Sequence, residues 1–174
     1  FDANGLAVGD ESLISATHQN HYQISASSLG SGFVVARVNS FDTNQTNGIS
    51  IHLVGANGTA SSEPTLLETV SLPYEDISIS SLSNDGFVVS WSDIHNNGRN
   101  VFAQIYSPAG DAVGDRFVVN TFLNNSINTM KNPSIASLPD GGFCITWQGG
   151  HPWDGSDTGL IGQRFASDGA FIGG

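Results

Sequence analysis

The sequence is poor in cysteine, in basic residues and in long hydrophobic runs, and each shortage excludes something. Cys144 is the only cysteine among 174 residues, so no disulfide can form within the chain. Asp and Glu number 16 against 5 Lys and Arg, for a formal net charge of −11 at pH 7. This charge repels phosphate backbones and anionic headgroups, which argues against a nucleic-acid partner. No apolar run approaches the roughly 20 residues of a membrane helix, so we expect no membrane insertion.

The chain begins at Phe1 without an initiating Met, and its first residues do not read as a signal sequence. We therefore expect it to be a piece of a longer protein. Its length is sufficient for one domain with a core of its own, because a chain of this size buries roughly 70% of its unfolded surface. With a core of that size, stability does not depend on disulfides.

Three copies of one segment divide the chain. Each copy begins with Ser-Leu, passes through a Gly-rich turn to a Gly-Phe pair and ends in an apolar run. The Phe residues, Phe33, Phe87 and Phe143, are 54 and 56 positions apart. A second shared segment follows each copy, so we expect a single domain of three repeats. The three copies are "SLGSGFVVAR" (28–37), "SLSNDGFVVSW" (81–91) and "SLPDGGFCITW" (137–147).

The N-terminus carries a further copy of the second shared segment. "FDANGLAVGD", Phe1 to Asp10, matches Phe165 to Gly174 nearly position by position, and Ser12 to Ala16 falls where "FVVNT" follows Asp115. We therefore expect this segment to supply the outer strand that the third unit lacks, beside Leu160 to Phe165. The alternative is an arbitrary cut through a longer array. The units would be approximately 17–70, 71–125, and 126–174 together with 1–16, within one domain over 1–174.

Each unit reads as four short strands and no helix. The first strand alternates polar and apolar residues, a tight turn with Gly and Asn or Asp follows, and the second strand is a continuous apolar run. The predicted fold is all-β, with three four-stranded, propeller-like blades. Three blades are few for a ring of roughly four to eight, so two chains could complete a six-bladed ring as a homodimer. A β-prism or β-trefoil arrangement is the alternative.

Several segments resemble the repeat unit of very large secreted bacterial adhesins of the repeats-in-toxin type. They are "DGGFCITWQ", the Asp-Gly-Ser-Asp loop, "GQRFASDGAFIGG", and "FVVNT" followed by "NPSIASLPDGG". The resemblance spans the chain but is weak in the first unit, where Arg37 replaces the Trp and "IHLVGANG" replaces the Gln-containing strand. It implies a non-catalytic, calcium-dependent extracellular module, secreted or at the cell surface. It implies a glycan or a peptide on a host or neighbouring cell as the partner.

The connections between the second and third strands of the units are the candidate site. They differ in length and content while the strands around them repeat, and rigid scaffolds carry specificity in such loops. The alternative is that they are solvated turns. The least ordinary residue is Trp153, because an exposed Trp reduces solubility unless it packs or stacks on a ligand. The candidate ligand-binding residues are Phe41, Asp42, Asp93, His95, Asn96, His151, Trp153, Asp154 and Asp157.

The third of these loops could hold calcium. Ca²⁺ takes about six to eight oxygen ligands, and Asp154, Ser156 and Asp157 with nearby carbonyls would supply part of that shell. The spacing does not match an EF-hand loop. Calcium is therefore the expected cofactor, with these three residues as its expected ligands.

Two other residue sets receive structural interpretations. Trp91 and Trp147 stand at equivalent repeat positions, which indicates packing. Cys144 aligns with Val34 and Val88 and is expected to be a small buried hydrophobic residue rather than a nucleophile.

The sequence leaves two rival functions open. A glycosidase-like propeller would need two facing carboxylates, and no Asp or Glu stands out as such a pair. We therefore expect no enzyme activity. A passive spacer in an extracellular stalk is the second rival, and it predicts no pocket and no ligand.

Overall fold

The computed structural model describes residues 21–40, 47–60, 64–70, 76–95, 98–121, 130–151 and 156–173, together with Asn4, Leu6, Glu11, Leu13 and Ile14. The described residues form three antiparallel sheets of four strands each, and each sheet keeps the sequence order of its strands. The prediction of an all-β chain built from four-stranded units is confirmed. No described segment is a helix with the length and apolar character needed to cross a bilayer.

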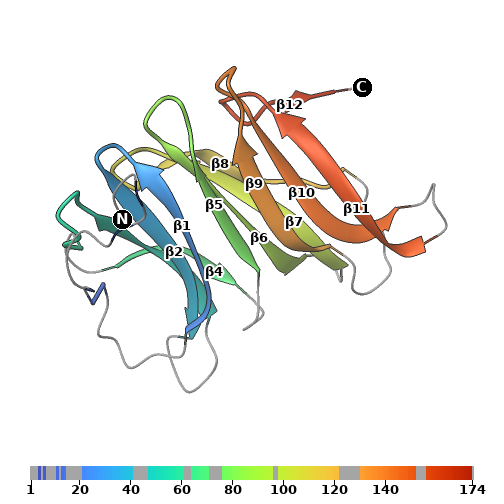
Figure 1. Ribbon diagram of the computed structural model, residues 1–174. Coiled ribbons are helices and arrows are strands. Elements are labelled where there is room, and N and C mark those ends of the chain that lie inside the picture. Colours follow the sequence, from blue (N-terminus) through green and yellow to red (C-terminus); the bar gives the residue numbers. More distant parts are fainter. Residues whose placement is uncertain are drawn as a thin grey trace.

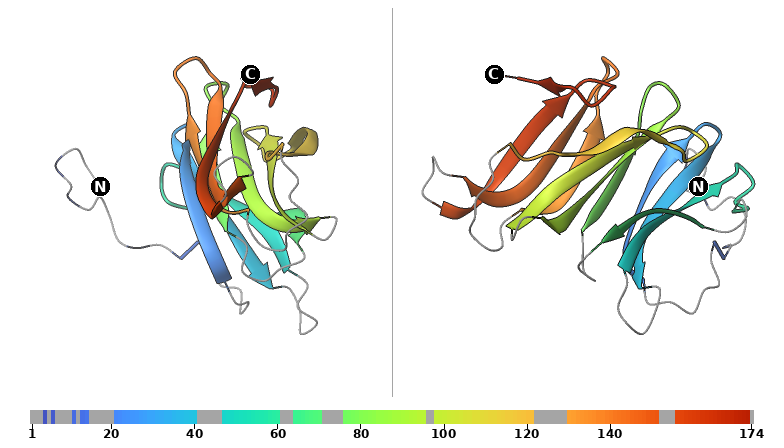
Figure 2. Two further views of the ribbon diagram at one scale, coloured as in Figure 1. Left: turned by 90° about the vertical axis from the view of Figure 1, so that its right-hand side faces the viewer. Right: turned by 180° about the vertical axis from the view of Figure 1, so that it is seen from behind.

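The three sheets follow one another in a row (Figures 1 and 2). The first contains β1 (His21–Leu29), β2 (Gly32–Ser40), β3 (Asn47–Val54) and β4 (Thr65–Val70). The second contains β5 (Ile77–Ser81), β6 (Phe87–His95), β7 (Gly98–Tyr106) and β8 (Ala112–Val118). The third contains β9 (Lys131–Ser137), β10 (Phe143–His151), β11 (Ser156–Phe165) and β12 (Phe171–Ile172).

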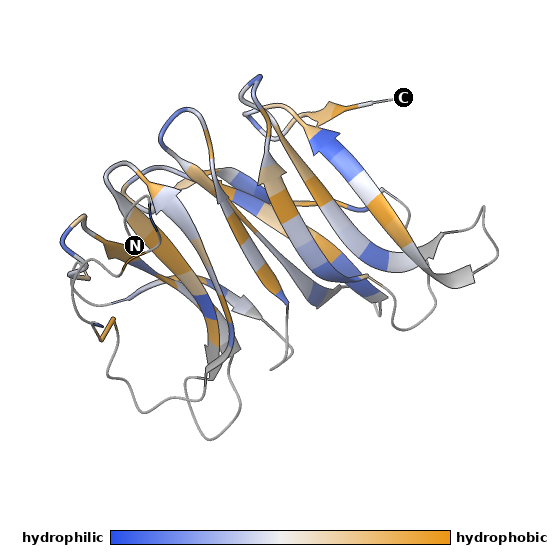
Figure 3. Cartoon of the chain, viewed as in Figure 1, coloured by the Kyte–Doolittle hydropathy of each residue, from blue (hydrophilic) through white to orange (hydrophobic). Residues whose placement is uncertain are grey.

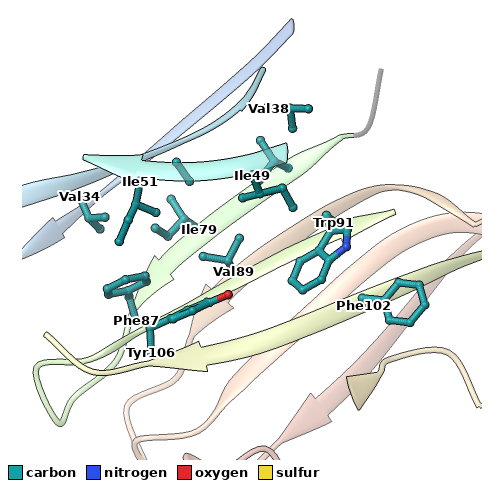
Figure 4. Close-up of a cluster of buried hydrophobic side chains, with 12 residues drawn as sticks. Val34, Val38, Ile49, Ile51, Ile79, Phe87, Val89, Trp91, Phe102 and Tyr106 are labelled. Carbon is teal, nitrogen blue, oxygen red and sulfur yellow. The ribbon is translucent and has the colours of Figure 1, made fainter. Parts of the chain in front are cut away.

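The core between the first and second sheets comes from residues that alternate along their strands (Figure 4). Phe87, Val89 and Trp91 of β6 point to the first sheet and are fully buried. Phe87 stacks on Tyr106 with ring centroids 5.2 Å apart, and Trp91 stacks on Phe102 at 6.1 Å. Because side chains on a strand alternate between its faces, the intervening residues of β6 and β7 face the third sheet.

The core between the second and third sheets repeats this arrangement. Val88 of β6 packs there with Phe143, Ile145 and Trp147 of β10. The two tryptophans predicted to pack, Trp91 and Trp147, are 0% and 3% exposed, so that interpretation is confirmed. The second sheet is therefore covered on both faces, which explains why its β6 and β7 are almost continuously apolar.

The Gly-Phe pair that marks the repeats has a steric cause. A Cβ at Gly86 would lie 2.6 Å from the carbonyl oxygen of Tyr106, and one at Gly142 would lie 2.4 Å from that of Phe165. Real Cβ atoms essentially never approach a backbone oxygen this closely. The glycine therefore lets the second strand of each unit start directly beside the last residue of the third strand.

Serine side chains join the first strands of neighbouring sheets. Ser25 Oγ on β1 accepts a hydrogen bond from the backbone N–H of Ile79 on β5 at 3.2 Å. One sheet further on, Ser78 Oγ accepts from the N–H of Ile135 on β9 at 3.1 Å. These N–H groups belong to edge strands, whose outer backbone groups have no strand partner. The repeated Ser in the first strand of the first and second units thus supplies an acceptor to the next sheet.

The expectation for the N-terminal segment is not met in this structure. The fourth strand of the third sheet is β12, which pairs with Arg164 and Phe165 of β11. Leu13 and Ile14, the described residues of 12–16, lie outside the strands, and Leu13 is 80% exposed. A short hairpin closes a small loop at little entropic cost, whereas the N-terminus would have to return across the chain. Ser12, Ser15 and Ala16 lie outside the described residues.

Cys144 also differs from expectation. It is partly exposed, although its equivalent residues Val34 and Val88 are fully buried. The reason is its position: Val88 faces the third sheet, whereas Cys144 occupies the face of the third sheet that points away from the second. The repeat in the sequence therefore predicted which strand position Cys144 occupies, but not whether another sheet covers that position.

Candidate functional site

The three variable connections share one edge of the structure. They join β2 to β3, β6 to β7 and β10 to β11, and because the sheets have the same strand order, these connections lie at the same strand ends (Figure 1). We call this the loop edge, meaning the ends of those six strands. The turns that join the first and second strands of each sheet lie at the opposite edge. The fold thus gathers the predicted loops on one side.

The nine candidate ligand-binding residues fall into three groups. Five lie outside the described residues: Phe41, Asp42, Asn96, Trp153 and Asp154. Of three others, and of Ser156, the structure describes only the backbone, and it places them at the loop edge. These are His95 at the end of β6, His151 at the end of β10, and Ser156 and Asp157 at the start of β11. Asp93 is the candidate whose side chain is described.

Asp93 lies near the end of β6, directly opposite Asn100 on β7, and is 6% exposed. A buried carboxylate is stable only when its charge is paired or hydrogen-bonded. The Asp93 carboxylate therefore interacts with neighbouring protein groups and is not presented to solvent. Its small exposed area limits contact with a ligand. Asp93 therefore belongs to the base of the β6–β7 loop.

A pair of asparagines that the sequence reasoning missed lies at the same base. Asn120 Oδ1 accepts the backbone N–H of Val101 at 2.8 Å, and Asn120 Nδ2 donates to Asn100 Oδ1 at 2.9 Å. Asn100 Nδ2 in turn donates to the carbonyl of Gly98 at 3.3 Å. Both asparagines are almost fully buried. The available signal was Asn120 itself, an amide that ends the apolar run "FVVN".

The loop edge between the second and third sheets has a similar polar base. Asp76 Oδ2, just before β5, accepts the backbone N–H of Asn132 at 2.9 Å. Asn132 has a left-handed backbone with φ of 54°, and its side-chain amide lies 2.9 Å from that of Gln148. Asn tolerates this conformation better than most residues. Figure 3 shows hydrophilic residues at these strand ends and hydrophobic residues along the strands.

Other acidic and amide residues serve the turns at the opposite edge. Asn84, Asp140 and Asp168 each accept the backbone N–H of the residue two positions later, at 2.9 to 3.1 Å. The N–H of Gly142 and then the Arg164 guanidinium hold the pKa of the Asp140 carboxyl below its usual range. Asp140 and Arg164 also form an exposed ion pair. Two of the acidic residues, Asp140 and Asp168, therefore have a structural role in turns.

The calcium prediction falls on side chains beyond the described part of the chain. Asp154 is outside it, and Ser156 and Asp157 are described only by their backbone at the start of β11. Among the described side chains, no group of three or more His, Cys, Asp or Glu could hold a metal ion. The predicted donors are oxygen atoms, which suit Ca²⁺ better than a transition metal. Calcium binding stays a prediction.

A shallow hollow of about 320 Å³ lies away from the loop edge. It is formed by the β1–β2 turn, the end of β3 and the β7–β8 turn, and it is largely apolar. Its lining is Leu29, Ser31, Gly32, Phe33, Leu53, Val54, Gly55 and Pro108. None of the nine candidate residues contributes to it.

Comparison with known proteins supports the fold. No protein-family model matches this chain. No curated protein matches it either. One solved structure with a similar fold is an endo-arabinase from Bacteroides thetaiotaomicron VPI-5482, with 14% sequence identity and a TM-score of 0.53. The match covers 88% of this chain and 58% of the endo-arabinase, so the chain spans little more than half of that enzyme's length.

Proposed function

We propose that this chain is a non-catalytic ligand-recognition module of a secreted or cell-surface bacterial protein of the repeats-in-toxin adhesin type. Its ligand would be a glycan or a peptide on a host or neighbouring cell, held by the loop edge with calcium. The observation that carries the proposal is the gathering of the β2–β3, β6–β7 and β10–β11 connections at one edge of three stacked sheets. Repeated residues build the core, and the residues that vary between repeats lie where a ligand has access.

The buried polar groups at the base of the loops support this role. The Asn100–Asn120 pair ties β7 to the chain after β8, and the Asp76–Asn132 bond ties the second sheet to the third. A recognition site needs loops that start from fixed points, because a loop ordered only on binding loses affinity. We propose that these bonds fix the positions of the loop bases, and that Phe41, His95 and Trp153 in the loops contact the ligand.

The sheets are further proposed to be propeller-like blades. Their first strands lie side by side, joined through Ser25 and Ser78, as the inner strands of successive blades would. Loops on one end of such blades form a shared surface. A spacer would need no such shared polar edge.

A glycan is the ligand class to test first. The structural neighbour described above carries the name of a carbohydrate-active enzyme, so a related sheet arrangement serves carbohydrate chemistry in that protein. Trp153, with His151 and the Asp residues beside it, would stack on a sugar ring and bond its hydroxyls. A peptide would instead use its carboxylate on a bound ion.

The test is a screen of the purified chain on glycan and peptide arrays, with and without calcium, followed by Trp153→Ala. Loss of binding with an unchanged melting temperature is expected, since stacking on a ligand contributes roughly 1 to 3 kcal/mol and an exposed ring adds little to the core. Trp147→Ala is the control and is expected to destabilise strongly, because Trp147 is 3% exposed. A Trp153 variant that unfolds as easily as the Trp147 variant would place Trp153 in the packing. Binding to no array component would favour a spacer, and release of sugars from arabinan would favour an enzyme.

The calcium proposal has its own test. A bound ion stabilises the folded chain by roughly 2.7 kcal/mol at a hundredfold excess over its Kd. Millimolar calcium is compared with magnesium at matched ionic strength, since any salt screens the net charge of −11. We expect calcium alone to raise the melting temperature, and we expect the double variant Asp154→Asn/Asp157→Asn to lose this rise. Equal melting temperatures in the two ions would reject the site.

A further inference from the structure

We draw no further inference here: the strongest candidate, the shallow apolar hollow of about 320 Å³ formed by the β1–β2 turn, the end of β3 and the β7–β8 turn, is a surface for which nothing in the structure shows what covers it.

Discussion

Trp91 and Trp147 offer a matched pair for testing how buried polar atoms are satisfied in this fold. The two indoles occupy the same repeat position and are 0% and 3% exposed. Trp147 Nε1 donates to the sulfur of Met130 at 3.2 Å. Trp91 Nε1 is buried with no acceptor among the described residues. Replacing each Trp by Phe removes the same ring atoms. At Trp147 it also removes a hydrogen bond, whereas at Trp91 it removes a buried donor that has no acceptor among the described residues.

The magnitudes follow from these two environments. The smaller ring forfeits roughly 2 kcal/mol at about 0.8 kcal/mol for each buried CH₂-sized group. At Trp91 this loss is offset, because the variant no longer buries an unsatisfied donor. Burying such a donor destabilises the parent chain by about 1 to 3 kcal/mol. At Trp147 the hydrogen bond of about 1 kcal/mol is lost in addition. We expect Trp91→Phe to change the free energy of unfolding by less than about 1 kcal/mol and Trp147→Phe to lower it by about 3 kcal/mol.

Urea unfolding followed by far-ultraviolet circular dichroism measures both variants. The slope of unfolding free energy against urea should be the same as in the parent chain, because neither change alters the surface exposed on unfolding. Equal losses in the two variants would refute the reasoning, since they would show that the Trp91 indole N–H is as well satisfied as that of Trp147.

Two further changes test the inter-sheet contacts and the buried phenol. Ser78→Ala removes the acceptor for the N–H of Ile135 and should lower the free energy of unfolding by about 0.5 to 1.5 kcal/mol in urea, more than Ser80→Ala on the same strand. Burial, followed by repulsion from the Glu68 carboxylate, raises the pKa of Tyr106 above its ordinary value of 10.0. The folded state thus favours the neutral phenol, so its contribution is complete below about pH 10 and is lost as pH rises above it. Tyr106→Phe should flatten this alkaline decline in unfolding free energy, and an unchanged decline would contradict the assignment.

The all-β architecture was predictable because its causes are local and repeated. Alternation in the first strands, Gly-rich turns and continuous apolar second strands each constrain a few neighbouring residues. Three copies of the pattern made the four-stranded unit visible, and Trp91 and Trp147 were assigned to packing for the same reason. The role of the repeated Ser was not visible, since the N–H that Ser78 accepts from lies in the next sheet.

The candidate site was predictable only in its location. The strand ends that the variable connections join do lie at one edge, because equal strand order in each sheet places equivalent strand ends together. The partners of single side chains were not predictable. Asn120 bonds to Val101 and Asn100, 19 and 20 positions away, and Asp93 is buried at the loop base. Such contacts depend on how the strands pair and stack, which no single segment encodes.

Equivalent sequence positions diverge most in the sheets at the two ends of the row. In the middle sheet Trp91 faces one neighbouring sheet and Val88 faces the other. In the first sheet the Trp position holds Arg37, which is 5% exposed and donates through Nε to Ser50 Oγ at 3.2 Å, and whose pKa is lowered by burial. In the third sheet the Val88 position holds Cys144, on a face that no described sheet covers. In the middle sheet these positions are apolar because a neighbouring sheet packs on them. In the end sheets they hold Arg37 and Cys144, on faces where the described chain has no further sheet. The departures from the repeat therefore lie on faces that no neighbouring sheet covers among the described residues, and the exposed Leu160, which pairs with Gln148 on the same face as Cys144, lies on one of them.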